Sequence, residues 1–234
     1  MTHTKRVVAL STVLLLCMSG MLAVAHVPYL EREDYTADEP FEVRRSIEQS
    51  IAVYAWLETD GVNPCTDVDV YQFSISEPSR VYLEGIVPVC RQYQNFSPWF
   101  ALVGPELPPP EYEVPFDVPE GYGAVVIPNP LPEEGERGSF YEPFGGKSYY
   151  NSSVYDEVIE VSGTYYVVYW DPLEIGGDYV AILGRAEIWG LRDIIRGLLV
   201  TPLIRMDMEL HVDCEEPPLL FCPGLVGGQR ATLQ

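Results

Sequence analysis

Basic residues are scarce in this chain of 234 residues, which has 14 Lys and Arg against 35 Asp and Glu and a formal net charge of −21. A chain this negative repels nucleic acid and anionic lipid headgroups, and it attracts cations and basic partners. Histidine is rarer still, with three residues. The catalytic motifs G-x-S-x-G and H-E-x-x-H and a Cys/His dyad are absent. We therefore predict that the protein binds no nucleic acid and is not an enzyme.

The long apolar run of the chain lies in its first 25 residues. Lys5 and Arg6 precede apolar residues up to Val24, and the run closes on the small residues Ala23 and Ala25. A basic start, an apolar middle and a small-residue end are typical of a secretory signal peptide. We predict a signal peptide over residues 1–25, a mature chain that begins at His26, and a secreted or cell-surface location. Without the signal peptide about 209 residues remain, which suits one domain.

Cysteine is infrequent, and its even number after cleavage agrees with export. Five are present, and Cys17 leaves with the signal peptide. Four cysteines in an exported chain indicate two disulfides with three possible pairings. We expect Cys65–Cys90 and Cys214–Cys222, because each pair is close in sequence. The C-x-x-C spacing of a metal-thiolate site is absent.

Helical periodicity is almost missing, whereas short strand patterns recur along the chain. These patterns are rich in β-branched and aromatic residues, and Gly, Pro, Asn or Asp separates them. They predict strands at residues 50–57, 69–75, 80–87, 99–103, 123–127, 154–161, 163–170 and 178–184. Many short strands without strand–helix alternation favour an all-β fold, an antiparallel β-sandwich of the jelly-roll type.

Proline and one helical pattern mark the other parts of the chain. We predict an N-terminal arm over 26–46 and a sandwich domain over 47–186, interrupted by a Pro-rich insertion at about 106–150. A helix is predicted within 187–204, with Ile188, Leu191, Ile195, Leu198 and Leu199 on one face and Pro202 ending or kinking it. That face is expected to pack on the sandwich, with a membrane interface as the alternative; the helix is too short for a membrane span. The disulfide-bonded tail, 205–234, is expected to be disordered beyond Cys222.

Residues 69–184 resemble the pre-peptidase C-terminal-type domains of bacteria and archaea. The matching segments are 67–73, with the pattern D-x-D-x-[aromatic]-x-F, the hairpin at 78–81, and residues 101–105, 162–168 and 177–182. The family consists of small extracellular jelly rolls attached to secreted enzymes and surface proteins. The resemblance implies an extracellular jelly roll. The chain is also similar to uncharacterised exported prokaryotic proteins.

Two metal ions are candidates for cofactors. Calcium prefers oxygen ligands, and acidic residues gather in two loops: Asp60, Asp67 and Asp69 in one, and Asp171, Glu174 and Asp178 in the other. Copper is the alternative, because cleavage after Ala25 would leave an amine and an imidazole together on His26, with His211 as the second imidazole.

Aromatic residues in the insertion suggest a binding surface. Tyr141, Phe144, Tyr149 and Tyr150 can stack on sugars or on a partner's side chains. Asn151 begins a glycosylation sequon, which is used only in a host with N-glycans. The leading hypothesis is a non-catalytic extracellular interaction module that binds a protein or glycan at the cell surface. A homo-oligomer is compatible with this hypothesis. An N-terminal-histidine copper protein is the alternative, and a secreted hydrolase is a distant one.

Overall fold

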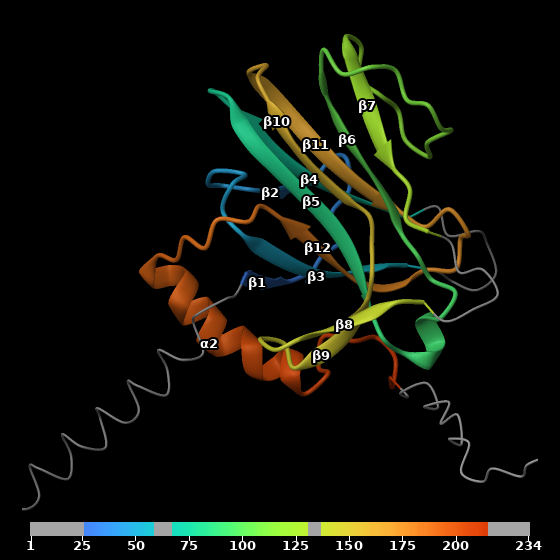
Figure 1. The fold of residues 1–234 in the computed structure, drawn as a ribbon, viewed down its shortest axis with the longest axis vertical. Helices are drawn as coiled ribbons and strands as arrows, with labels where there is room; N and C mark the ends of the chain where they lie inside the picture. Colours follow the sequence, from blue (N-terminus) through green and yellow to red (C-terminus); the bar gives the residue numbers. More distant parts are fainter. Residues whose placement is uncertain (1–25, 59–66, 131–136, 215–234) are drawn as a thin grey trace, which may run out of the picture.

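The protein is a sandwich of two β-sheets with further layers on both outer faces (Figure 1). The structure, a computed structural model, describes residues 26–58, 67–130 and 137–214. The predicted signal peptide, Asp60, Cys65 and Cys222 lie outside these residues. The prediction of an all-β sandwich is confirmed.

The first sheet has seven strands. In spatial order these are β1 (Val27–Leu30), β3 (Ile51–Leu57), β12 (Gly177–Leu183), β5 (Ser79–Pro88), β9 (Lys147–Tyr150) and β8 (Ser139–Glu142), and β10 (Val154–Ile159) pairs with β5 beside this path. The second sheet has five strands, in the order β2 (Phe41–Glu42), β4 (Val68–Ile75), β11 (Gly163–Trp170), β6 (Trp99–Pro105) and β7 (Tyr122–Ile127). A short 3-10 helix, η1 (Arg91–Tyr93), follows β5.

The sheets are mixed, so the prediction of a purely antiparallel sandwich was wrong at two edges. The strands β1 and β2, which the sequence analysis assigned to an arm without strands, pair in parallel with β3 and β4. A parallel pair needs a long crossover connection, and the chain provides one because it visits the other sheet before it returns. The remaining strand pairs are antiparallel.

The main core lies between the sheets and is unusually rich in tyrosine. Tyr71, Tyr165, Tyr169 and Tyr179 are fully buried there together with Phe100. Their rings contact one another mostly at tilted or edge-on angles; the centroids of Tyr169 and Tyr179, for example, are 5.0 Å apart. Buried tyrosines need partners for their hydroxyl groups, and these partners define part of the site described below.

The Pro-rich insertion covers the outer face of the second sheet. Val114, Phe116 and Val118 pack there on a cluster that includes Ala101 and Trp170. The predicted strand within the insertion is confirmed as β7, and its Ala124 amide donates to the carbonyl of Pro108. The sequence analysis missed the hairpin of β8 and β9, which extends the first sheet.

Helix α2 (Leu191–Arg205) covers the outer face of the first sheet, but with the face opposite to the one expected. Its buried residues are Asp193, Gly197 and Ile204. The residues expected to pack, Ile188, Leu191, Ile195, Leu198 and Leu199, are all at least half exposed. Periodicity identified the apolar face correctly but contained no information on which face the sheet binds. Pro202 lies inside the helix and does not end it.

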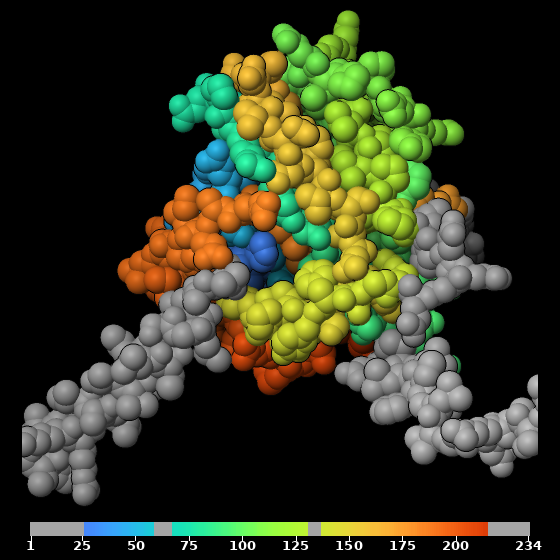
Figure 2. Space-filling view, viewed as in Figure 1, coloured from blue at the N-terminus to red at the C-terminus, as the bar shows by residue number. Residues whose placement is uncertain are grey.

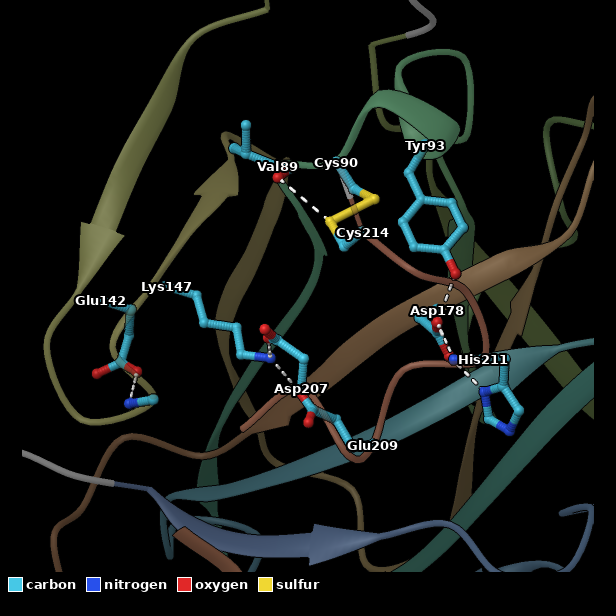
Figure 3. A network of polar contacts seen from close by, with 11 residues as sticks. Val89, Cys90, Tyr93, Glu142, Lys147, Asp178, Asp207, Glu209, His211 and Cys214 are labelled. Atoms are coloured by element: carbon cyan, nitrogen blue, oxygen red, sulfur yellow. Dashed lines mark hydrogen bonds and ion pairs between the residues drawn. A yellow bond between two sulfur atoms is a disulfide. The ribbon is translucent and has the colours of Figure 1, made fainter. Parts of the chain in front are cut away.

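The expected disulfide pairing was also wrong. Cys90, after β5, is bonded to Cys214, with Cα atoms 5.3 Å apart and 124 residues between them in sequence (Figure 3). The pairing depends on the return of the tail to the end of β5, which proximity in sequence cannot indicate. Lys147 on β9 forms ion pairs with Asp207 and Glu209 in the same tail. No helix in the described part of the chain has the length and apolar character needed to cross a membrane.

Candidate metal centre

The N-terminal arm crosses from one sheet to the other at one end of the sandwich. It leaves β1 in the first sheet, where the Glu31 amide donates to the carbonyl of Tyr54. It reaches the second sheet at Tyr35, whose carbonyl accepts from the Val70 amide at 2.6 Å, and it then forms β2. The crossing segment therefore carries its acidic residues past the ends of β3 and β4.

Three carboxylates meet at this crossing. Glu31 and Asp34 come from the arm and Asp69 from β4, and one oxygen of each lies within 4.8 Å of the others. Asp69 is fully buried, Glu31 is half-buried and Asp34 is exposed. The cluster thus extends from the interior of the sandwich to the solvent.

Hydrogen bonds orient the two inner carboxylates. Asp69 Oδ2 accepts from the Tyr179 hydroxyl at 2.6 Å, and the Tyr71 hydroxyl lies 3.0 Å from the hydroxyl of Tyr179. Glu31 Oε2 accepts from the Trp56 amide at 2.7 Å. The second oxygen of each carboxylate, Asp69 Oδ1 and Glu31 Oε1, is buried and finds no hydrogen-bond donor among the described residues; the two carboxyl groups can bond to each other only if one of them is protonated. Buried polar atoms are rarely left without a partner, so these two oxygens require an explanation.

The electrostatics of the cluster are unfavourable for negative charge. Burial raises the pKa of Glu31 to about 7 and raises the pKa of Asp69 well above its usual range. Burial and then the charge of Asp67 raise the pKa of Asp34. Among the described residues, no ion pair joins Glu31, Asp34 or Asp69 to a basic side chain.

A hard divalent cation fits this donor set. Calcium binds six to eight oxygens at about 2.4 Å, so two of its ligands are at most about 4.8 Å apart. The three carboxylate oxygens satisfy that limit. A cation would give Asp69 Oδ1 and Glu31 Oε1 a partner, while the exposed side of Asp34 leaves room for water ligands.

The structure brings together only part of the calcium set expected from the sequence. Asp69 is in the cluster, and Asp67 lies near enough to influence it but accepts from the Glu58 amide at 2.6 Å. Glu31 and Asp34 were missed. The acidic run of residues 31–34 was a possible signal, but its position beside β4 depends on the crossing of the arm.

The second expected calcium loop does not form a ligand set. Asp171 accepts from the amides of Leu173, Ile175 and Gly176, so it closes its own turn. Glu174 lies within that turn. Asp178 accepts from the Tyr93 hydroxyl and from both the amide and the Nδ1 of His211, which links the tail to β12 (Figure 3).

The two histidines of the expected copper site lie at opposite ends of β3. His26 is hydrogen-bonded to Ser50, just before this strand, and burial lowers its pKa to about 4. His211 stacks on Trp56, near the other end, with ring centroids 4.2 Å apart. Trp56 is six positions beyond Ser50 along the strand, which corresponds to about 20 Å. The structure therefore does not bring these imidazoles together.

The expected aromatic surface divides into exposed and buried residues. Tyr141 is 63% exposed on β8, whereas Tyr149 and Tyr150 are buried in the core. Phe144 and Tyr149 line a pocket of about 110 Å³ together with His26. The pocket lies between the β8–β9 hairpin and the strands of the first sheet, on the side of the molecule that faces the viewer in Figure 2. Asn151, the sequon residue, is exposed directly after β9.

Fold and site together define a two-sheet β-sandwich with a carboxylate cluster where its N-terminal arm crosses between the sheets. No protein-family model matches the chain, and a search of curated proteins finds no similar sequence. The arguments that follow therefore depend on the chain's own residues.

Proposed function

We propose that the protein is an exported, non-catalytic interaction module of the extracellular space or cell surface, and that calcium stabilises it. Calcium would bind Glu31, Asp34 and Asp69 and fasten the N-terminal arm across the end of the sandwich. One observation carries the proposal: Asp69 is fully buried, and its Oδ1, which belongs to the cluster, has no hydrogen-bond donor among the residues that the structure describes.

The geometry explains why an ion at this place would stabilise the whole fold. Asp69 belongs to the second sheet, and its partner Tyr179 belongs to the first. Glu31 follows β1 at the edge of the first sheet. An ion held by Glu31 and Asp69 would therefore connect both sheets through the arm. Calcium sites of extracellular modules commonly work at the high calcium concentrations found outside cells.

The interaction surface that we propose is the β8–β9 hairpin. Phe140 and Tyr141 are its exposed aromatic residues, and the pocket beside them is lined by Phe144, Glu142 and His26. Apolar rings next to a carboxylate and an imidazole suit a protein or glycan partner.

The decisive experiment is thermal unfolding of the exported protein in calcium and in a chelator. With free calcium about a hundredfold above Kd, binding stabilises by about 2.7 kcal/mol. For a chain of this size we expect Tm to rise by roughly 5–10 °C. Asp34→Asn should abolish most of the rise, and because Asp34 is exposed, its replacement does not disturb the core.

Asp38→Asn is the matched control, since Asp38 is an exposed aspartate of the same arm outside the cluster. It should keep the full response to calcium. A wild-type Tm that is the same in calcium and in chelator would refute the site. An Asp34→Asn variant whose Tm rises in calcium as much as that of the wild type would refute it too.

A further inference from the structure

Helix α2 presents an apolar face to the solvent. Leu191 is 74% exposed and Leu199 is 68% exposed. At about 100° per residue, the exposed apolar residues of the helix fall within a stripe of about 100°. The stripe continues beyond both ends of the helix, and its members are Ile188, Leu191, Ile195, Leu198, Leu199, Met206 and Met208. An exposed apolar stripe of this size indicates an interaction surface.

The opposite face holds the helix firmly on the sandwich, so the exposure is a stable property of the fold. Ile204 is fully buried in the cluster on the outer face of the first sheet. Asp193 accepts from the amide of Gly190 and forms an ion pair with Arg45 at 2.6 Å. Arg205 donates to the carbonyls of Pro143 and Phe144 in the hairpin.

The charge along the helix differs from the charge of the whole molecule: three arginines flank the stripe, and two exposed acidic residues, Glu187 and Asp207, lie at its ends. Three arginines of α2, Arg192, Arg196 and Arg205, are exposed and have no ion-pair partner among the described residues. Arg196 lies over the Tyr29 ring, 3.9 Å from its centroid, and Arg205 also holds the hairpin, so within the described part of the chain Arg192 is the arginine of the three without such a contact to the fold. At about 100° per residue, Arg192 and Arg196 fall beside one edge of the stripe, and Arg205 falls beside the other edge. The one acidic residue of the helix, Asp193, is buried and already paired.

We propose that α2 binds the surface of an anionic lipid membrane, with its leucines and isoleucines among the acyl chains and its arginines at the headgroups. Apolar residues flanked by arginine are typical of interfacial helices. Fifteen residues give a length of about 22 Å, so the helix would lie along the membrane. This inference is independent of the calcium site.

The arginines favour a membrane as the occupant. They lie at both edges of the stripe, where they would meet anionic headgroups while the apolar residues between them enter the acyl chains. The helix stands on β1 at one side of the fold, which leaves the stripe free to lie flat on a surface (Figure 1). A second copy of the chain is the competing occupant, but it would have to bring three like-charged arginines on each side into one interface.

The test is flotation of the exported protein with vesicles of phosphatidylcholine and phosphatidylglycerol, compared with phosphatidylcholine alone. We expect the wild type to float with the anionic vesicles. Replacing Leu191, Leu198 and Leu199 together by Ser should reduce binding at least about tenfold. Arg192→Gln should reduce it about fivefold. The matched control replaces Val154, Val158 and Leu173 by Ser, which are also exposed apolar residues but lie far from the helix in sequence.

Each outcome decides the question. A wild type that stays with no vesicle overturns the proposal, and so does a triple leucine variant that floats as well as the wild type. A third outcome would identify a second copy of the chain as the occupant of the helix. In that case the wild type is a dimer in solution, and the leucine replacements make it a monomer without changing flotation. The membrane proposal would then be wrong. Unchanged Tm values of both triple variants show that the fold is intact.

Discussion

Asp69 lies between the sheets, where a carboxylate without compensation is costly. Tyr179 donates its single hydroxyl proton to Asp69, so the neighbouring Tyr71 must donate to Tyr179. This chain of hydroxyls ends at the cluster and leaves Asp69 Oδ1 facing Glu31. A residue that would be destabilising alone thus becomes a link between sheets once a cation or a shared proton completes it.

His26 allows a test of pH dependence at the scale of one residue. Its pKa in the folded protein is about 4 because the ring is buried, against an unfolded value near 6.5. Between pH 6.5 and pH 4, the imidazole of His26 is protonated in the unfolded chain but stays neutral in the folded chain. The stability that His26 contributes is therefore complete above pH 6.5 and is lost as the pH falls toward 4.

From pH 7 to pH 5, we expect the free energy of unfolding to fall less in His26→Gln than in the wild type. The difference should be on the order of 1–2 kcal/mol, and urea unfolding measures it. Glu31, with a folded pKa of about 7, acts in the opposite direction over the same range but affects both proteins equally. Parallel pH profiles of the two proteins would show that the imidazole is not buried in the neutral form.

At the scale of elements, the β8–β9 hairpin separates recognition from packing. Tyr141 and Tyr149 lie on adjacent strands, but Tyr141 is 63% exposed and Tyr149 is 2% exposed. We predict that Tyr149→Ala lowers the free energy of unfolding by about 3 kcal/mol or more, because it leaves a cavity beneath the hairpin. Tyr141→Ala should change it by less than about 0.5 kcal/mol. Equal losses in chemical denaturation would mean that the hairpin is a structural cover only.

The sequence predicted the longer strands well because their two-residue alternation and flanking turns are local signals. The strands β3 to β7 and β10 to β12 fall close to the expected ranges. The short strands β1, β2, β8 and β9 were missed, since two to four residues become a strand only through the edge that they join. For the same reason the pairing of Glu31 and Asp34 with Asp69 was not predictable.

Helix α2 shows a different limit of local signals. Its position was predicted, but its orientation was not, because the first sheet binds the face with Asp193 and Gly197. Gly197 allows close approach: a Cβ atom there would lie 3.0 Å from the Trp189 ring. Small and capping residues can thus decide which face packs, while periodicity reports only where the apolar residues are.

At the scale of the whole molecule, the tail from α2 to Cys214 closes the structure. It passes Lys147 on β9 and Asp178 on β12 before it reaches Cys90 (Figure 3). Cys90 and Cys214 are 124 positions apart in sequence. The segment between them includes strands of both sheets and the entire Pro-rich insertion. Cross-linking so long a loop restricts the unfolded chain strongly.

We predict that replacing Cys90 and Cys214 together by Ser lowers the free energy of unfolding by about 2–5 kcal/mol. Because Cys90 is fully buried, part of the loss reflects packing, and the wild type measured in reducing agent separates that part from the effect of the cross-link. Peptide mapping without reduction should recover Cys90 and Cys214 in one linked fragment. Fragments that link Cys65 to Cys90 and Cys214 to Cys222 would contradict the structure and restore the pairing expected from proximity in sequence. In that case the tail would not be covalently joined to β5, and α2 would be held only by non-covalent contacts such as those of Asp193, Val200 and Ile204.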